Sequence, residues 1–333
     1  MLAGTEEAIR TQDIRLDSVK VAMVPAPQKS RTTAGVPAAL RALLSGLIDY
    51  AGMFPPAKLS LEEAAKNFIH YMGGRHAWML GKLVLRAAQL TEFRDYLTGN
   101  PGARGRTISL SVLLGAEPLR DAQRIREAQD LATAGASPLF SVDAVEVRPG
   151  SPAMVAELAA ILPKGLPVFC EVATREDLAR WLTALKQVGW FAKIRTGGTS
   201  REAFPSSSEV AEFLVQCKTH GVAFKATAGL HHPVRSEHPL TYDANSPCGV
   251  MHGFINVFLG AALLECGISK DQLIAVLDHT DARHFSFSGD FAHWGKLFVN
   301  QDDVAGTRRH FAMSFGSCSF EEPIQDLQKL ALL

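Results

Sequence analysis

The sequence lacks an excess of charge of either sign and lacks a long apolar run. Its 34 Lys and Arg residues balance 34 Asp and Glu residues, so the formal net charge is zero. Without a basic stripe or an acidic tail, we expect no nucleic-acid partner. The longest apolar run, FINVFLGAALL (254–264), is much shorter than the roughly 20 residues that span a bilayer. We therefore expect no membrane partner.

Cysteine is also scarce. Five cysteines at irregular spacing argue against a disulfide framework and favour a reducing compartment. The opening residues, MLAGTEEAIR, are acidic and are not followed by an apolar segment, unlike a secretory signal. We expect a soluble, cytoplasmic protein. No cysteine has a base next to it in the sequence, so all five are interpreted as structural.

What the chain does have is an alternation of short apolar runs with amphipathic segments. Strands are predicted at 47–52, 82–87, 106–115, 144–148, 166–172 and 310–320, and within the runs 191–198 and 222–232, and helices follow most of them. The spacing of about 25–35 residues is typical of a (β/α)8 barrel, which belongs to the α/β class. We assign residues 1–45 to an N-terminal lead-in segment with a short helix, and 46–333 to a single barrel domain.

The eighth strand comes late, so residues 230–309 are predicted to be an insertion between strands seven and eight. We expect this insertion to form a lid at the catalytic face, because it leaves a strand at its carboxyl end. It contains a helix at 250–266 that is apolar on nearly all sides. Such a helix is buried either in its own domain or in the interface of a homo-oligomer.

Two lysines, Lys193 and Lys225, stand out among the predicted strands. They lie in FAKIRTGG (191–198) and VAFKATAGLHH (222–232), which are separated by the helical SSSEVAEFLVQCKTHG (206–221). A strand–helix–strand unit makes the two strands adjacent and parallel, so both lysines face one mouth of the barrel. One ammonium is expected to lower the pKa of the other, and apolar surroundings are expected to lower it further. A lysine tuned in this way attacks carbonyl compounds through a Schiff base. The alternative is two surface lysines that extend from strand ends.

Charged residues recur at the carboxyl ends of the other predicted strands, where barrel enzymes have their chemistry. Among them, Glu146 and Glu171 are placed to move protons near the lysines. A layer of salt bridges that closes the barrel is the alternative, although buried ion pairs stabilise weakly. We assign to catalysis Lys193, Lys225, Glu146, Glu171 and Asp49. We assign to substrate binding Arg86, Arg148, Arg195, Gly197, Gly198, Gly229, His231, His232, Gly316, Ser317 and Ser319.

Two further patterns concern ligands. Ser317, Cys318 and Ser319 precede a predicted helix in which Ser319 and Glu322 have capping-box spacing. The free N–H groups of such a helix attract anions, and capping by Ser319 alone is the simpler interpretation. A zinc set of His231, His232, Cys248 and His252 fits no established spacing. We expect no metal and no cofactor.

Six segments in the same order resemble the class I, Schiff-base aldolases, and most of all the deoxyribose-phosphate aldolase group. They are LIDYAGMFPPAKLSLEEA (47–64), AVEVR (144–148), LPVFCEVATREDL (166–178), FAKIRTGG (191–198), FKATAGL (224–230) and SFGSCS (314–319). The resemblance implies that Lys193 is the nucleophile, Lys225 its electrostatic partner and Glu146 the proton relay. Asp49 and Glu171 are then supporting carboxylates.

This chain departs from that family in several places. It has glutamate at position 146 where the family has aspartate, so the carboxylate reaches one methylene further. The seventh strand ends in Ala228-Gly229 where the family usually has two glycines, Arg235 is the nearest basic residue after it, and the insertion of 230–309 is foreign to the family.

Three functions follow from these patterns. The first is an aldehyde-lyase that acts on a small carbonyl substrate, phosphorylated or otherwise anionic. The second is a metal-dependent, enolase-like barrel in which Glu146 and Glu171 are ligands, although 45 residues are too few for the capping domain of that superfamily. The third is a non-catalytic barrel that binds a small anion. A fold alone does not choose among them.

Overall fold

A computed structural model describes residues 35–333, except for 101, 103–104, 135–138 and 174–176. The lead-in predicted for residues 1–34 therefore lies outside the described residues. A compact unit spans Ala34–Leu333. Its first helix, α1 (Ala38–Leu44), packs against α10 (Gln301–His310) and thus belongs to the barrel unit.

Eight parallel strands close into a barrel in the order β1-β2-β3-β4-β5-β6-β7-β13. Their bounds are β1 (Ile48–Tyr50), β2 (Leu80–Arg86), β3 (Ile108–Leu113), β4 (Phe140–Val147), β5 (Val168–Glu171), β6 (Phe191–Arg195), β7 (Phe224–Thr227) and β13 (Ala312–Ser317). The predicted (β/α)8 fold is confirmed, and so is the parallel pairing of the two strands that carry the lysines.

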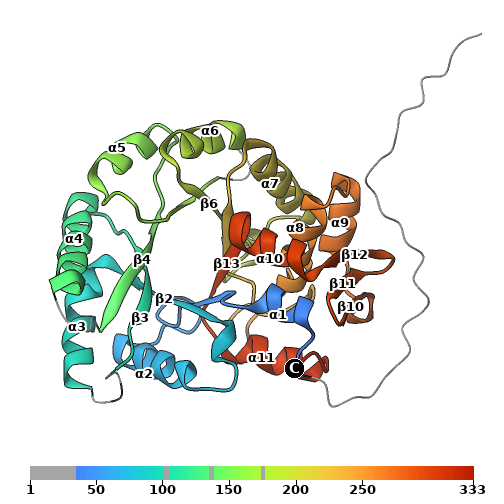
Figure 1. Ribbon diagram of the computed structural model, residues 1–333, viewed down its shortest axis with the longest axis horizontal. Helices are drawn as coiled ribbons and strands as arrows, with labels where there is room; N and C mark the ends of the chain where they lie inside the picture. The colour runs from blue at the N-terminus through green and yellow to red at the C-terminus, as the bar shows by residue number, and fades with distance from the viewer. Residues whose placement is uncertain (1–34, 101, 103–104, 135–138, 174–176) are drawn as a thin grey trace, which may run out of the picture. The chain divides into compact units, whose positions relative to one another are not determined.

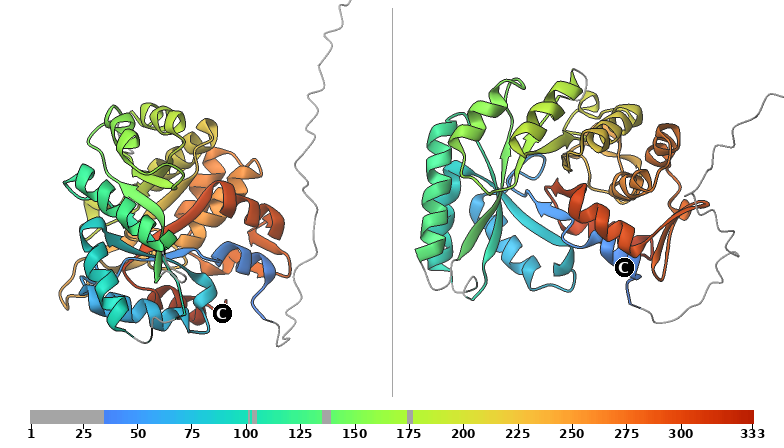
Figure 2. Two further views of the ribbon diagram at one scale, coloured as in Figure 1. Left: turned by 60° about the vertical axis from the view of Figure 1, so that its left-hand side comes forward. Right: turned by 45° about the horizontal axis from the view of Figure 1, so that its top comes forward.

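The helices α2–α7 surround these strands (Figure 1), and the two further views show the same arrangement (Figure 2). They are α2 (Leu61–Met72), α3 (Leu90–Gly99), α4 (Pro118–Ala134), α5 (Met154–Ile161), α6 (Leu178–Val188) and α7 (Ser207–His220). Local chemistry fixes where some begin: at α2, the Ser60 hydroxyl accepts from the Glu63 N–H, and the Glu63 carboxylate accepts from the Ser60 N–H. The last helix is α11 (Glu321–Lys329).

The segment between β7 and β13 contains three parts. A hairpin of β8 (Ser236–Pro239) and β9 (Cys248–Met251) comes first. Two helices follow, α8 (Phe254–Glu265) and α9 (Lys270–Asp278). An antiparallel sheet of β10 (Phe285–Ser288), β11 (Phe291–Trp294) and β12 (Leu297–Asn300) leads into α10.

Helix α8 is the apolar helix expected from the sequence, and it is buried within its own chain. Residues 254–264 are all buried, and the rings of Phe254 and Phe258 pack on Phe315 and Phe224 of the barrel strands. The subunit interface that the sequence left open is therefore not needed to bury it.

The insertion does not lie on one face of the barrel. The β10–β12 sheet packs against α1, which precedes β1 and so sits toward the amino ends of the strands. The lid predicted for 230–309 stays a prediction, and the hairpin of β8 and β9 is the part of this segment that comes next after the carboxyl end of β7.

Candidate active site

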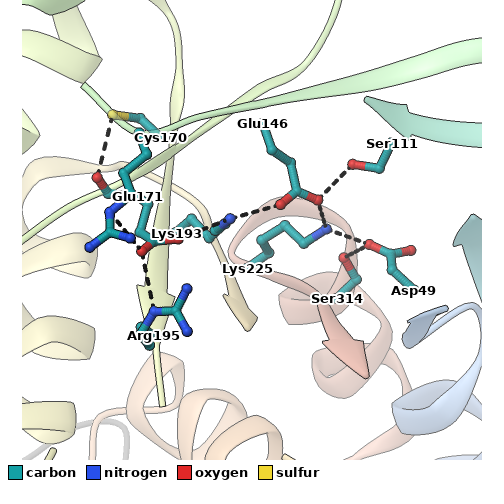
Figure 3. A network of polar contacts seen from close by, with 10 residues as sticks. Asp49, Ser111, Glu146, Cys170, Glu171, Lys193, Arg195, Lys225 and Ser314 are labelled. Atoms are coloured by element: carbon teal, nitrogen blue, oxygen red, sulfur yellow. Dashed lines mark hydrogen bonds and ion pairs between the residues drawn. The ribbon is translucent and has the colours of Figure 1, made fainter. Parts of the chain in front are cut away.

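Lys193 and Lys225 lie side by side on β6 and β7, paired in register. The Lys193 Nζ is 2.8 Å from Glu146 Oε2 and 3.1 Å from Glu171 Oε2. The Lys225 Nζ is 2.6 Å from Glu146 Oε1 and 2.7 Å from Asp49 Oδ2. The structure therefore brings together the five residues that the sequence assigned to catalysis, from β1, β4, β5, β6 and β7. We call them the lysine network (Figure 3).

The lysine network alternates in sign from the mouth inward. At the mouth, the Nε atoms of Arg148 and Arg195 lie 3.4 and 3.3 Å from the same oxygen of Glu171. The other oxygen of Glu171 holds Lys193, Glu146 joins Lys193 to Lys225, and Asp49 pairs with Lys225 (Figure 3). Exposure falls along this path, from 72% for the Arg148 side chain to 1% for that of Lys225.

Neutral donors complete the two innermost carboxylates. The Ser111 hydroxyl donates to Glu146 Oε1 at 2.7 Å, and the Ser314 hydroxyl donates to Asp49 Oδ2 at 2.8 Å. The backbone N–H of Lys82 donates to the other Asp49 oxygen at 2.7 Å. Sequence reasoning missed Ser111 and Ser314, although a serine within an otherwise apolar strand is a usable signal, because alternate residues face the barrel interior.

The charges set the pKa directions inside the network. Burial raises the pKa of the Glu146 and Asp49 carboxyls, but the lysine ammonium groups outweigh it, so both pKa values lie below the ordinary ones. Burial likewise opposes the charged form of Lys225. Asp49 and Glu146 outweigh it, and the pKa of Lys225 is raised. The pKa of Lys225 is thus not lowered by its apolar surroundings, because its ammonium contacts two carboxylates.

The remaining predicted residues are distributed around the network. Arg86 ends β2 and stacks over the Phe54 ring at 4.7 Å, and among the described residues it makes no ion pair with the lysine network. Gly197 and Gly229 lie where two loops meet backbone to backbone: a Cβ on Gly229 would lie 2.7 Å from the Gly197 Cα. Gly198 is similarly crowded by Ala203, and Gly316 on β13 by Thr227. Close packing against backbone at Gly197 and Gly229, and against side chains at Gly198 and Gly316, thus accounts for these glycines beside any contact with substrate.

The serines near β13 serve the start of α11. Ser319 Oγ accepts a hydrogen bond from the Glu322 N–H at 3.1 Å, and Ser317 Oγ accepts one from the Ser319 N–H at 3.3 Å. The reciprocal half of the predicted capping box does not form, because the Glu322 carboxylate turns to His231, 2.9 Å away. The sequence predicted an anion site at this start of α11. The carboxylates of Glu321 and Glu322 in the first turn disfavour a bound anion there.

The predicted zinc set is dispersed. His231 Nδ1 pairs with Glu322, and His232 Nδ1 lies 2.6 Å from Asp326 Oδ2. His252 Nε2 donates to the Pro205 carbonyl oxygen, 2.7 Å away. Within the described ranges, no group of three or more His, Cys, Asp or Glu residues is arranged to hold a metal ion. Glu146 and Glu171, the ligands of the enolase-like alternative, hold an ammonium between them.

Two surface pockets lie away from the lysine network. One has a volume of about 230 Å³ and is lined by residues of α2 and α11, and the other lies between α2 and α3. In the part of the chain that is described, no helix is long and apolar enough to cross a membrane.

Comparisons with known proteins add little to this geometry. No family model and no curated protein matches the chain. A solved structure, the spore cortex-lytic enzyme SleL of Bacillus cereus, is similar over 86% of this chain and 73% of its own, with 12% sequence identity and a TM-score of 0.34. A similarity this weak carries no argument about function. The closed ring of eight parallel strands by itself identifies the chain as a (β/α)8 barrel.

Proposed function

We propose that this barrel is an aldolase-type lyase in which Lys193 forms a Schiff base with a small carbonyl substrate. The observation that carries the proposal is the position of the Lys193 ammonium, directly between the carboxylates of Glu146 and Glu171. Buried ion pairs contribute little net stability, so a network of this size favours a chemical role. The resemblance to Schiff-base aldolases supports the same assignment.

The reaction begins when Lys193 gives up a proton, and both carboxylates are close enough to accept it. The neutral amine adds to the carbonyl carbon and forms a carbinolamine. The former carbonyl oxygen then takes up protons and leaves as water, which gives an iminium ion.

Cleavage uses the iminium as an electron sink. A hydroxyl group on the β-carbon loses its proton to a carboxylate, the bond between the α- and β-carbons breaks, and an aldehyde leaves. The bond's electron pair becomes the enamine. Protonation of the α-carbon regenerates the iminium, and water hydrolyses it to a second carbonyl compound and free Lys193. No redox partner is required.

Lys225 has a supporting role in this scheme. Its raised pKa keeps it an ammonium ion at neutral pH, and it holds Glu146 through one carboxylate oxygen while the other oxygen faces Lys193. Asp49 and Ser314 hold Lys225 from the opposite side. Lys225 is thus a positioning residue, and Glu146 exchanges protons with Lys193.

The substrate that suits the mouth is an anionic carbonyl compound. Arg148 and Arg195 each contact Glu171 through Nε, which leaves their terminal amino groups for a carboxylate or phosphate. Both guanidinium groups are partly exposed, so a small anion reaches them from solvent.

Borohydride trapping tests the proposal. The protein is incubated with a panel of small aldehydes and keto acids, reduced, and read by intact mass and peptide mapping. We expect an adduct on Lys193 that disappears in Lys193→Met and weakens in Lys225→Met. Lys186→Met is the matched control, because Lys186 is an exposed helical lysine bound to the Gly221 carbonyl oxygen. If the folded protein gives no adduct with any compound, the proposal is overturned, and stabilisation by an anion without an adduct would favour the binding barrel.

A further inference from the structure

A second cluster of reactive side chains lies outside the lysine network, around Cys318. This cysteine follows β13, and its Sγ is 3.9 Å from Nε2 of His231, a residue 87 positions earlier that follows β7. On the other side of the imidazole ring, Nδ1 is 2.9 Å from Glu322 Oε2 at the start of α11. The interpretation of all five cysteines as structural depended on the absence of a neighbouring base in the sequence, and the fold brings such a base to Cys318.

This arrangement has the order of a catalytic triad. A thiol, an imidazole and a carboxylate are connected through opposite nitrogens of one histidine, as nucleophile, base and orienting group. A carboxylate at Nδ1 keeps a proton on that nitrogen. Against the opposing effect of burial, Cys318 and this carboxylate raise the pKa of the imidazole to about 9, so above this pH Nε2 of the neutral ring is free to accept the thiol proton. His231 is only 8% exposed, which shields this exchange from bulk water.

One other feature favours chemistry at this sulfur. The Tyr242 hydroxyl donates to Glu322 Oε2 at 3.2 Å, which helps to hold this carboxylate against His231, and the same hydroxyl lies 3.6 Å from the sulfur.

The other cysteines provide the contrast. Burial raises the pKa of the Cys170 thiol to about 12 and that of Cys217 well above its ordinary value. Cys266 is exposed as a residue, but its thiol is partly shielded from water. This shielding, together with the nearby Asp303, raises the pKa of the Cys266 thiol. Among the described residues, Cys318 is the one cysteine with a hydrogen bond to a histidine ring.

We propose that Cys318 is a thiol nucleophile that accepts an acyl group from an activated ester or thioester, with His231 as its general base and Glu322 orienting His231. Nε2 of His231 takes the thiol proton while Sγ bonds to the acyl carbon. The alcohol or thiol leaves with that proton, and a thioester remains on Cys318. Water then attacks the thioester, gives a proton to His231 and releases a carboxylic acid and the free thiol.

The test uses p-nitrophenyl acetate on the full-length protein at pH values from 7 to 10, which span the raised pKa of His231, with acid quenching, intact mass and peptide mapping. We expect a burst of p-nitrophenolate and one acetyl group on Cys318. The exposed Cys266 is the internal reference, and we expect it to react more slowly. Peptide mapping also distinguishes acetylation of Cys318 from acetylation of Lys193. The result for Cys318 is therefore independent of the proposed lyase activity.

Variants decide whether His231 activates the sulfur. In His231→Gln, acetylation of Cys318 should slow by about 100-fold or more, the contribution of a general base. His220→Gln is the matched control, because His220 is bonded to a carbonyl oxygen on α7 and should leave the rate unchanged. Glu322→Gln keeps the side-chain shape, serves if His231→Gln does not fold, and should also slow acetylation. Equal acetylation of Cys266 and Cys318, or a Cys318 rate that neither Glu322→Gln nor a folded His231→Gln lowers, would overturn the proposal.

Discussion

Replacement of Lys225 by methionine should expose the electrostatic cost of the lysine network. The Lys225 ammonium is the shared partner of two carboxylates, at 2.7 Å from Asp49 and 2.6 Å from Glu146, and both carboxylate side chains are at most 4% exposed. Methionine fills a similar volume but leaves Asp49 without an ammonium partner, while Glu146 keeps Lys193. Removal of one partner from a buried ion pair costs about 3–5 kcal/mol, so we expect the free energy of unfolding to fall by that amount at pH 7.

The pH dependence gives the sharper test. In the wild type, the pKa values of Asp49 and Glu146 are lowered, so their stabilising contribution is fully present above about pH 4.5 and is lost at more acidic pH. In Lys225→Met, burial of Asp49 acts without the opposing Lys225 ammonium and raises the pKa of Asp49, while Glu146 keeps Lys193. Protonation then favours the folded state, and the stability difference from the wild type should narrow as the pH falls from 7 to 5.

Urea denaturation at several pH values measures both effects. Lys193→Met is the matched control, because Glu146 then keeps Lys225 and Ser111 while Glu171 keeps Arg195; we expect a loss of only about 1–3 kcal/mol. Adding Asp49→Asn to Lys225→Met removes the carboxylate that lost its ammonium partner and should restore part of the stability. A loss below about 1 kcal/mol in Lys225→Met, or a difference that does not change between pH 7 and pH 5, would refute this reasoning.

Two further predictions concern the glycines Gly229 and Gly306 and the imidazole of His231. Gly229→Ala should lower the free energy of unfolding by about 1–3 kcal/mol, because Gly229 has a φ of 72° and the new Cβ would lie 2.7 Å from the Gly197 Cα. Gly306→Ala should instead raise the free energy of unfolding by about 0.5–1 kcal/mol, because Gly306 lies in α10 and its new Cβ would have nothing within 4 Å. Urea denaturation compares the two variants. Burial opposes protonation of His231, but Cys318 and Glu322 raise the pKa of its imidazole from 6.5 to about 9. Its stabilising contribution is therefore full below pH 6.5 and lost as the pH rises through 9, so Tm measured from pH 6 to 10 should fall less steeply in His231→Gln, and an identical slope would contradict this.

The barrel could be predicted from the sequence because each barrel strand is an apolar run followed by a helical pattern. Helix α10 was missed for a physical reason. Its sequence, QDDVAGTRRH (301–310), has only two buried residues, Val304 and Thr307, so it lacks an apolar stripe. It is held by tertiary contacts, in which Arg308 donates to the Leu43 carbonyl oxygen at 2.9 Å and to the Ser45 carbonyl oxygen at 3.1 Å.

In the candidate site too, contacts within one strand–helix–strand unit could be predicted, and contacts that depend on the closed barrel could not. Lys193 and Lys225 could be placed together because one strand–helix–strand unit carries both and fixes their pairing. The contact between Cys318 and His231 could not be found in this way, since it joins two loops whose separation depends on closure of the barrel. The raised pKa of Lys225 was missed because its direction depends on which charges approach most closely, and no pattern within one strand contains that information.

The glutamate at position 146, which departs from the aspartate of the resembling family, has a geometric reason in this fold. Each of its two oxygens holds a different lysine, at 2.6 Å for Lys225 and 2.8 Å for Lys193, while Ser111 adds a third hydrogen bond. An aspartate would withdraw the carboxylate by roughly 1.5 Å, the length of one carbon–carbon bond, and could not keep both contacts without a shift of the strands. Because a buried ammonium without a partner is costly, the longer side chain and the two lysines form one unit. The extra methylene is therefore what allows a single carboxylate to connect the proposed nucleophile to its positioning lysine.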